Sequence, residues 1–334
     1  MNTSFLSPSL RVFFKRTLMV VALLMSSVMG ALIIAIVFGG PSIPAPLASI
    51  NEPFRNVDFS ALPKLTHYQA ADGVHLAYRH YESLSGDVKG SIVLVHGSSA
   101  TSTSMHVMAS AFAKRGFEVC ALDIRGHGQS GTKGTIKYVG QLENDLVSFV
   151  QAVPLKNPVK LVGFSAGAGF VLRFAGSPHQ DIFDSYVLLS PYLGSDAPNY
   201  SPNGGGWVAA GIPRIISLGL MNRLGIHHFN DLPVINFALD ESAKQFLTTS
   251  YSFSLASNFG PLRDYEANIK AVHRPVAIIA GASDEVFLTN MLEGIFRKQG
   301  KTWPVTLVPE VGHIELTLDA DAVNTVVEIV QAFR

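Results

Sequence analysis

The chain has little cysteine, no excess of charge of either sign and no internal repeat. Cys120 is the one cysteine among 334 residues, so no disulfide can form within the chain, and its apolar surroundings indicate a buried small side chain. The 25 basic residues equal the 25 acidic ones, so the composition favours neither a nucleic acid nor another polyanion as a partner. The pair His227 and His228 lacks the ligand spacing of a metal site. The sequence predicts no metal and no cofactor.

A long uncharged run lies near the N-terminus, at residues 17–38. At about 1.5 Å per helical residue, this run can cross a hydrocarbon core of about 30 Å. The alternative is a cleaved signal peptide, which has a shorter apolar region of about 7 to 15 residues and a small-residue cleavage site. The sequence after residue 38 offers no clear cleavage site. We therefore predict an uncleaved transmembrane helix over residues 17–38.

The charges that flank this run indicate its orientation. Arg11, Lys15 and Arg16 precede it, and the first charged residue after it is Glu52. Basic residues stay preferentially on the cytoplasmic side of a membrane. We expect a single-pass protein with a cytoplasmic tail at 1–16 and a periplasmic, extracellular or lumenal domain. Residues 39–62 are rich in Pro, Ala and Ser and are predicted to be a linker that lifts the domain off the bilayer.

Beyond residue 62, short apolar runs alternate with helical patterns. Residues 65–70 and 74–81 flank a turn signal and are predicted to form an antiparallel strand pair. Further strands are predicted at 91–95, 117–122, 159–163, 185–190, 276–280 and 304–308, and helices near 105–115, 138–153, 166–175 and 319–333. This alternation predicts the α/β class, with a mostly parallel central sheet flanked by helices.

Residues 163–167 read Gly163-Phe164-Ser165-Ala166-Gly167, a GxSxG pattern between a strand-like run and a helix-like run. A serine on such a sharp turn exposes its Oγ, and the flanking glycines leave room for the strained backbone. Ser165 is therefore the candidate nucleophile of a serine hydrolase. The alternative is a Gly-rich turn without chemistry.

Two candidate partners follow Ser165 in the chain. Asp284 comes just after the strand-like run 275–279, at the sheet edge where α/β proteins bind ligands. His313 follows the run 304–308 and is the candidate base, with Asp284 orienting its ring. Asp284 could instead be a turn or N-cap residue, and Glu285 is its nearest competitor as the acid. The order Ser, Asp, His is that of α/β-hydrolases.

Backbone amides are the expected donors to a developing oxyanion. The Ala166 amide follows the nucleophile directly. The second candidate is the Ser98 amide, because the apolar strand 91–95 runs straight into His96-Gly97-Ser98. A plain strand-to-helix loop is the alternative at Ser98.

The residues that carry a family resemblance are His96-Gly97, the octapeptide Asp123-Ile124-Arg125-Gly126-His127-Gly128-Gln129-Ser130, the GxSxG turn, Asp284 and His313. The octapeptide is similar to a DxRGHGxS loop, and we interpret it as a turn held by hydrogen bonds rather than as catalytic. Over about residues 61–334 the chain resembles the α/β-hydrolase superfamily, and within it lysophospholipase-like and monoglyceride-lipase-like serine hydrolases. It departs from them in the serine- and threonine-rich stretch 98–104, and at Phe164, where many monoglyceride lipases have histidine.

The strand and helix alternation stops between residues 193 and 273. We predict a first part of the hydrolase core at 63–194, an insertion at 195–275 and a second part at 276–334. The resemblance implies that this insertion is a helical lid. Its apolar stretch 207–226 fits a lid that lines an acyl pocket or touches the membrane. A helical cap that buries its own core fits equally well.

The sequence therefore predicts a membrane-anchored serine hydrolase that cleaves carboxylic esters through an acyl-enzyme. A lipid-like or other apolar acyl ester is favoured because the lid and the anchor are both apolar. A peptidase, a thioesterase, a carbon–carbon hydrolase, an acyltransferase and a haloperoxidase-like enzyme can use the same triad. A membrane-tethered binding protein on the same fold is the alternative from another class.

Overall fold

An eight-stranded sheet forms the centre of the computed structural model, which describes residues 8–333. In spatial order its strands are β1 (Leu65–Gln69), β2 (His75–Tyr81), β4 (Glu118–Leu122), β3 (Ser91–Val95), β5 (Val159–Phe164), β6 (Ser185–Leu189), β10 (Val276–Gly281) and β11 (Val305–Val308). β2 pairs antiparallel with both β1 and β4, and all strands from β4 to β11 are parallel. The predicted α/β sheet is confirmed.

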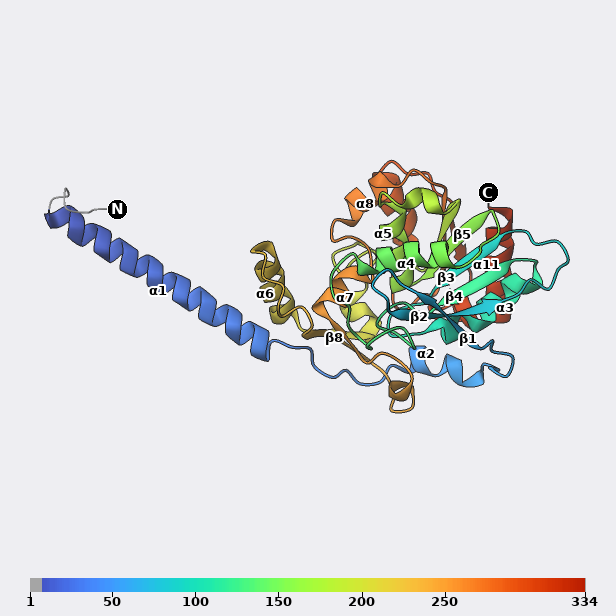
Figure 1. The fold of residues 1–334 in the computed structure, drawn as a ribbon, viewed down its shortest axis with the longest axis horizontal. Coiled ribbons are helices and arrows are strands. Elements are labelled where there is room, and N and C mark those ends of the chain that lie inside the picture. Colours follow the sequence, from blue (N-terminus) through green and yellow to red (C-terminus); the bar gives the residue numbers. More distant parts are fainter. Residues whose placement is uncertain (1–7, 334) are drawn as a thin grey trace.

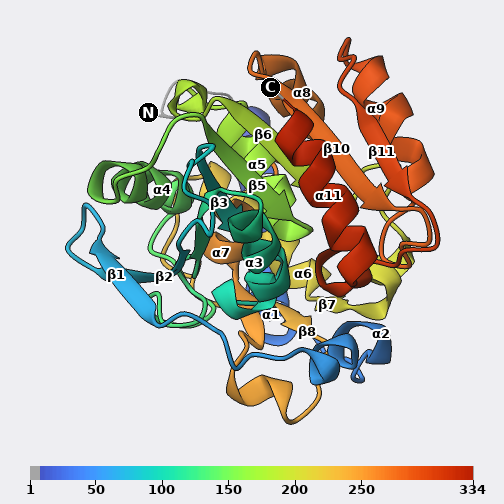
Figure 2. The ribbon, with the colours of Figure 1, turned by 90° about the vertical axis from the view of Figure 1, so that its right-hand side faces the viewer.

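Helices cover both faces of this sheet (Figures 1 and 2). α3 (His106–Lys114) and α11 (Ala320–Ala332) pack together on one face, and α4 (Gln141–Ala152), α5 (Ala166–Ala175) and α8 (Tyr265–Ala271) lie on the other. α9 (Leu292–Lys298) and α10 (Glu315–Leu318) belong to the C-terminal part. Short 3₁₀ helices lie at Pro53–Asn56, Ser102–Met105, Gln180–Ile182, Pro202–Gly206, Ala243–Gln245 and Thr289–Met291.

The core lies between the sheet and these helices. Every residue of the central strands β3, β5, β6 and β10 is buried. Parallel strands covered on both faces bury all their side chains, which explains the continuous apolar runs in the sequence. α11 shows the complementary helical pattern, because its buried valines recur three or four residues apart and the Asp319 carboxylate caps its first amides. These elements fix the strand ends at which the candidate residues lie.

Residues 195–275, for which the resemblance predicted a helical lid, contain strands as well as helices. They contain β7 (Val208–Ala210), α6 (Ile212–Arg223), β8 (Pro233–Phe237), β9 (Ser250–Ser252) and α7 (Phe253–Asn258), and the three strands form a small antiparallel sheet. Residues 233–237 read Pro-Val-Ile-Asn-Phe, whose β-branched and aromatic side chains favour a strand once neighbours pair on both sides. α8 packs on α5, where Asn268 donates to the Leu172 carbonyl at 3.0 Å. The helical packing of the core therefore resumes before residue 276.

α1 (Pro8–Phe38) projects away from the domain, as Figure 1 shows. The stretch Val12–Phe38 is long and apolar enough to cross a membrane, and none of its most apolar window is buried against the protein. The helix thus begins upstream of the predicted span 17–38 and ends where that span ends. Of the predicted tail at 1–16, residues 1–7 lie outside the described residues.

The predicted linker at 39–62 is not a free tether. It contains α2 (Ala48–Asn51) and the 3₁₀ helix Pro53–Asn56, and Ile50 is buried in the main core. The Leu47 amide donates to the Ala238 carbonyl at 3.0 Å, which joins this segment to the end of β8. Its apolar residues at 47, 50 and 54 find partners on the domain, so burial of apolar surface offsets the entropy of ordering this segment.

Candidate active site

Ser165 lies on a strained turn between β5 and α5. Its φ of 55° is unusual for a non-glycine residue. The flanking glycines are required by close backbone contacts: a Cβ at Gly163 would lie 2.4 Å from the Gly167 carbonyl oxygen, and one at Gly167 would lie 2.2 Å from the His96 carbonyl oxygen. The GxSxG pattern is therefore a steric requirement of this turn, which directs the Ser165 side chain to the carboxyl end of the sheet.

His313 and Asp284 meet Ser165 at that edge. The His313 Nε2 atom lies 3.0 Å from Ser165 Oγ, and its Nδ1 atom lies 2.8 Å from Asp284 Oδ2. The other Asp284 oxygen accepts hydrogen bonds from the amides of Val286 and Phe287. The structure therefore brings Ser165 together with two residues that lie more than a hundred positions further along the chain.

Burial of Asp284 would raise its pKa, but the His313 imidazole and the Phe287 amide outweigh burial, so the pKa of this carboxyl is lowered. The Asp284 side chain is fully buried. A carboxylate in this state accepts a hydrogen bond from Nδ1–H and leaves Nε2 free to accept the Ser165 hydroxyl proton.

Glu285, the competitor for the acid, has a different contact. Its carboxylate accepts a hydrogen bond from the His313 backbone amide at 3.0 Å and does not reach the ring. Glu315 accepts from the Gly312 amide at 2.7 Å in the same way. These two carboxylates hold the loop that carries His313, and the contact to the imidazole belongs to Asp284.

Aromatic rings fix the position of the imidazole. The Phe164 ring centroid lies 4.8 Å from that of His313, and the Phe287 ring meets it edge-on at 5.2 Å. Phe164 is the residue at which this chain departs from many monoglyceride lipases. Here its side chain packs on the His313 ring and lines the pocket.

The two candidate oxyanion donors lie beside the nucleophile. Ala166 occupies the first position of α5, where backbone N–H groups have no partner within the helix. The loop that holds Ser98 is close as well, because a Cβ at Gly97 would lie 3.4 Å from Ser165 Cβ. Within residues 8–333 the Ser98 amide donates to no protein acceptor. Both amides are thus available to a ligand at Ser165.

The insertion holds this loop through Tyr251. The Ser99 amide donates to the Tyr251 hydroxyl at 2.6 Å, and that hydroxyl meets His127 Nε2 at 2.5 Å. The His127 Nδ1 atom faces the Ile124 carbonyl at 3.2 Å, which fits a neutral ring that donates from Nδ1 and accepts at Nε2. Burial and the neighbouring His96 place the pKa of His127 well below its usual value. The octapeptide and the insertion therefore fix the backbone next to Ser98.

Two further contacts join the same loop to the insertion. The Trp207 indole donates to Ser98 Oγ at 2.8 Å. Thr248 exchanges two bonds with Ser99, since its amide donates to the Ser99 carbonyl and its carbonyl accepts from Ser99 Oγ. The serines at 98 and 99, which depart from the family pattern, are the residues that make these contacts.

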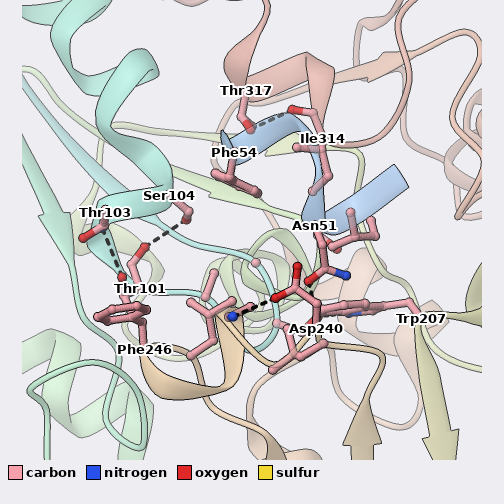
Figure 3. Close-up of a pocket in the computed structure, with 18 of the residues that line it drawn as sticks. Asn51, Phe54, Thr101, Thr103, Ser104, Trp207, Asp240, Phe246, Ile314 and Thr317 are labelled. Carbon is pink, nitrogen blue, oxygen red and sulfur yellow. Dashed lines mark hydrogen bonds between the residues drawn. The ribbon is translucent and has the colours of Figure 1, made fainter. Parts of the chain in front are cut away.

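The site opens into a largely apolar pocket of about 460 Å³, a size typical of small-molecule sites. Figure 3 shows Phe54 and Ile314 on one side of it and Phe246 and Asp240 on the other. Phe164, Ser165, His313, Ile314 and Thr317 line it, together with three further parts of the chain. They are the segment before the core (Ile50, Asn51, Phe54, Arg55, Phe59), the loop after β3 (Gly97, Ser98, Ala100, Thr101, Thr103, Ser104) and the insertion (Trp207, Leu239, Asp240, Ser242, Ala243, Phe246, Leu247).

A comparison with models of protein families assigns the chain to a family. The family model Hydrolase_4, described as serine aminopeptidase S33, matches residues 86–317. The chain belongs to the Hydrolase_4 family. This match covers the GxSxG turn, Asp284 and His313, and it makes the chain a member of a serine hydrolase family with the α/β-hydrolase fold.

Individual relatives of this Hydrolase_4 chain match shorter stretches. It is 28% identical over 128 residues to a monoacylglycerol lipase of Mycolicibacterium smegmatis, a match that covers 37% of this chain and 45% of the relative. It is 30% identical over 112 residues to a putative non-heme chloroperoxidase of Synechocystis sp., covering 34% of this chain and 40% of that protein. The matched stretch thus spans less than half the length of both relatives.

A solved structure extends the similarity over the fold. A soluble variant of the monoglyceride lipase of Saccharomyces cerevisiae, in complex with a substrate analog, superimposes with a TM-score of 0.63 at 19% identity. The match covers 83% of this chain and 96% of the lipase chain. The α/β-hydrolase fold of this Hydrolase_4 member is therefore established from its superposition as well as from its sheet.

The octapeptide loop of this hydrolase is held by charge as well as by His127. The Arg125 guanidinium donates two hydrogen bonds to Asp145 at 2.7 Å each and two to Asp72 at 3.0 and 3.2 Å. Asp123 accepts bonds from the amides of Ser102 and Gln129. These contacts agree with the structural interpretation of the loop.

Sequence reasoning missed several residues around the site. Trp207 and Tyr251 were not singled out as contacts of the oxyanion loop, and residues 50–59 were placed in a linker. The Pro53 start signal and the apolar spacing of residues 47, 50 and 54 could have indicated a short packed helix there. Among the described residues of this Hydrolase_4 chain, no group of three or more His, Cys, Asp or Glu could hold a metal ion.

Proposed function

We propose that this protein is a membrane-anchored serine hydrolase that cleaves carboxylic esters with an apolar acyl group, using Ser165, His313 and Asp284 as its triad. The observation that carries the proposal is the hydrogen-bonded chain from Asp284 through His313 to Ser165 Oγ, at 2.8 and 3.0 Å, at the base of an apolar pocket.

The chemistry follows from these contacts. Ser165 Oγ attacks the ester carbonyl while His313 Nε2 takes its proton, and the carbonyl oxygen becomes negative. The amides of Ser98 and Ala166 stabilise that charge. The carbon–oxygen bond to the alcohol then breaks, and the alcohol leaves with the proton from His313. Water repeats the sequence on the acyl-enzyme and releases the carboxylic acid and free Ser165.

The lining of the pocket favours an apolar ester as the substrate over a peptide with a free N-terminus. A peptide N-terminus carries a positive charge and needs an unpaired carboxylate. Asp240 is the one carboxylate among the described lining residues, and it already accepts bonds from Ser242, the Ala243 amide and Arg55. The relative in Mycolicibacterium smegmatis is a monoacylglycerol lipase, which agrees with a single acyl chain as the substrate group. The aminopeptidase in the family description is therefore the less favoured activity.

Membrane anchoring is supported by how α1 joins the domain. Arg214 on α6 is buried, and it donates to the Ile36 and Val37 carbonyls at 2.7 and 3.0 Å. These carbonyls belong to the last turn of α1, where carbonyl groups lack partners within the helix. Arg214 thus caps α1 and joins it to the insertion.

α6 presents an apolar face beside the end of α1 (Figure 1). Ile212, Ile216, Leu220 and Leu224 recur every fourth residue and are all exposed, from 41% at Leu220 to 74% at Leu224. Four-residue spacing puts Ile212, Ile216 and Leu220 on one helix face, and Leu224 follows at the C-cap. An exposed apolar face next to a membrane span is suited to the lipid interface. We propose that this face lies against the outer leaflet, with the N-terminus cytoplasmic and the domain extracytoplasmic.

The test combines active-site labelling with ester hydrolysis. The full chain in detergent should react with a fluorophosphonate probe, and Ser165→Ala should abolish labelling. The same preparation should hydrolyse p-nitrophenyl esters, with higher kcat/KM for medium acyl chains than for acetate. A folded protein that stays unlabelled would indicate a binding protein on the same fold, and a preference for acetate would contradict the apolar acyl substrate while leaving the triad intact.

A further inference from the structure

The segment between α1 and the core forms one wall of the pocket. Ile50, Phe54 and Phe59 line it together with the triad residues Ser165 and His313. Figure 3 shows Phe54 beside Ile314, the residue after His313, and opposite the insertion residue Phe246. The wall is therefore built from the stretch that lies between the proposed membrane span and the hydrolase core.

Hydrogen bonds hold this segment against the insertion. The Asn51 side chain donates to the Ala238 carbonyl at 2.9 Å and to the Leu47 carbonyl at 2.6 Å. Earlier in the segment, the Asn236 amide group donates to the Ser42 carbonyl at 2.9 Å. These side-chain bonds to backbone carbonyls join the segment to the C-terminal end of β8, at Asn236 and at Ala238. Its position is set by specific contacts.

An ion pair also joins the segment to the insertion, on the solvent-exposed side of their contact. The Arg55 guanidinium lies 3.1 Å from Asp240 Oδ2, and both residues line the pocket. Hydrogen bonds from Ser242, the Ala243 amide and Arg55 lower the pKa of Asp240 to about 2, so the carboxylate is charged at neutral pH. Arg55 is 62% exposed, and exposed pairs contribute little to stability. Asn51 and the buried Ile50 hold the segment, and the ion pair places charge at the pocket rim.

We infer that residues 50–59 are part of the acyl-binding site and determine which acyl chain lengths this hydrolase accepts, with Phe54 as the main specificity residue. The inference rests on the proposed esterase function. A wall of aromatic and aliphatic side chains gains affinity with each methylene that it covers. Phe54 adds such a wall from outside the hydrolase core, so the chain-length preference is set by the membrane-proximal segment as well as by the insertion.

The experiment measures kcat/KM for p-nitrophenyl acetate and p-nitrophenyl decanoate with the full chain in detergent. Phe54→Ala should lower the decanoate-to-acetate ratio roughly tenfold, the size of effect that a lost apolar contact has on discrimination. Phe54→Trp should shift the preference toward shorter chains, because the larger ring occupies pocket volume. Ile43→Ala is the matched control, since Ile43 lies in the same segment, is 82% exposed and does not line the pocket. It should leave the ratio unchanged.

Fluorophosphonate labelling of each variant separates the two proposals. A wild-type protein that is folded and unlabelled would overturn the proposed function itself. Suppose that the Phe54 variants are labelled and that their decanoate-to-acetate ratio of kcat/KM equals that of the wild type. This result would overturn the role of residues 50–59 and would not contradict the proposed triad. Normal labelling with a lowered ratio in Phe54→Ala, and no change in Ile43→Ala, is the expected result.

Discussion

The Trp207 indole N–H donates to the Ser98 hydroxyl at 2.8 Å, across 109 positions of the chain. The insertion thus contacts the side chain of Ser98, whose backbone amide we propose as an oxyanion donor. This contact holds the loop that carries Ser98, and both residues also line the pocket.

The first prediction concerns this pair. Trp207→Phe and Ser98→Ala should each lower kcat up to about tenfold, because each removes one hydrogen bond that positions the loop. KM for the same ester should change less than kcat. The double variant should be no worse than either single variant, since both remove the same bond. Additive losses in this double-mutant cycle would show that Trp207 acts by another route.

A second prediction assigns the triad acid. Asp284→Asn should lower kcat by about 10⁴-fold, because the imidazole loses the carboxylate that selects its tautomer. Glu285→Gln should reduce kcat by at most about tenfold, since an amide oxygen still accepts the His313 backbone N–H bond. Steady-state kinetics on matched preparations, with Ser165→Ala as the blank, decide between them. A larger loss in Glu285→Gln would reassign the acid.

Acid sensitivity of the fold is the third prediction. Burial lowers the pKa of His96, and burial together with His96 lowers that of His127 below the ordinary value of 6.5. The unfolded chain therefore binds protons that the folded chain does not, so stability should fall as the pH drops below about 6.5. Each histidine contributes a slope of up to about 1.4 kcal/mol per pH unit.

His127→Gln keeps a polar side chain in place and should lower this slope by up to about 1.4 kcal/mol per pH unit in urea titrations between pH 5 and 6.5. The rest of the slope should remain, because burial also lowers the pKa values of His96 and His106. His228→Gln, on an exposed residue, is the control and should retain the full slope. Equal slopes in wild type and His127→Gln would mean that His127 is charged in the folded protein.

The fourth prediction is a stability difference between two arginines. Arg125→Leu removes the partner of Asp145, whose side chain is 9% exposed, and should cost about 3–5 kcal/mol of unfolding free energy. Arg115→Leu breaks a pair with Glu328 that is mostly exposed and should cost less than about 1 kcal/mol. Chemical denaturation of both variants measures the difference. Similar losses of unfolding free energy in the two variants would show that the Arg125 cluster is solvated.

A fifth prediction addresses the junction of α1 and α6. Arg214→Leu leaves carbonyls at the end of α1 without a donor, at about 1–3 kcal/mol for a buried group. Cleavage by an added protease within residues 39–46 should become at least about tenfold faster, because local opening follows this free energy. Arg223→Leu, on the same helix with an exposed side chain, is the control. Unchanged cleavage in Arg214→Leu would show that other contacts hold the junction.

The sequence allowed the fold, the sheet and the positions of Ser165, Asp284 and His313 to be predicted, since each of these residues follows a parallel strand with an apolar pattern. Strand ends meet at one edge of such a sheet, so local patterns were enough to place them together. The contacts of Trp207 and Tyr251 span 109 and 152 positions, and no local pattern encodes them. The same holds for Phe54, whose neighbours are fixed only when the insertion has folded.

The insertion was predicted to be helical from the family resemblance, and its short strands gave no local signal against that prediction. β7 and β9 have three residues each, too few for an alternating pattern to stand out from a helical one. Pairing across the insertion supplies the stabilisation that these short segments lack alone. In this part of the chain, pairing between strands therefore determined the secondary structure more than local propensity did.

The Arg214 cap has a mechanical consequence. Hydrogen bonds from Arg214 to the last carbonyls of α1 fix the orientation of this helix relative to the domain. A change in the tilt of α1 therefore reorients the whole domain. Transmembrane helices lean more steeply in thin bilayers than in thick ones. In the membrane-anchored arrangement that we propose, the mouth of the pocket would change its angle to the lipid surface with bilayer thickness, and lipid composition would modulate ester hydrolysis without any ligand binding to the protein.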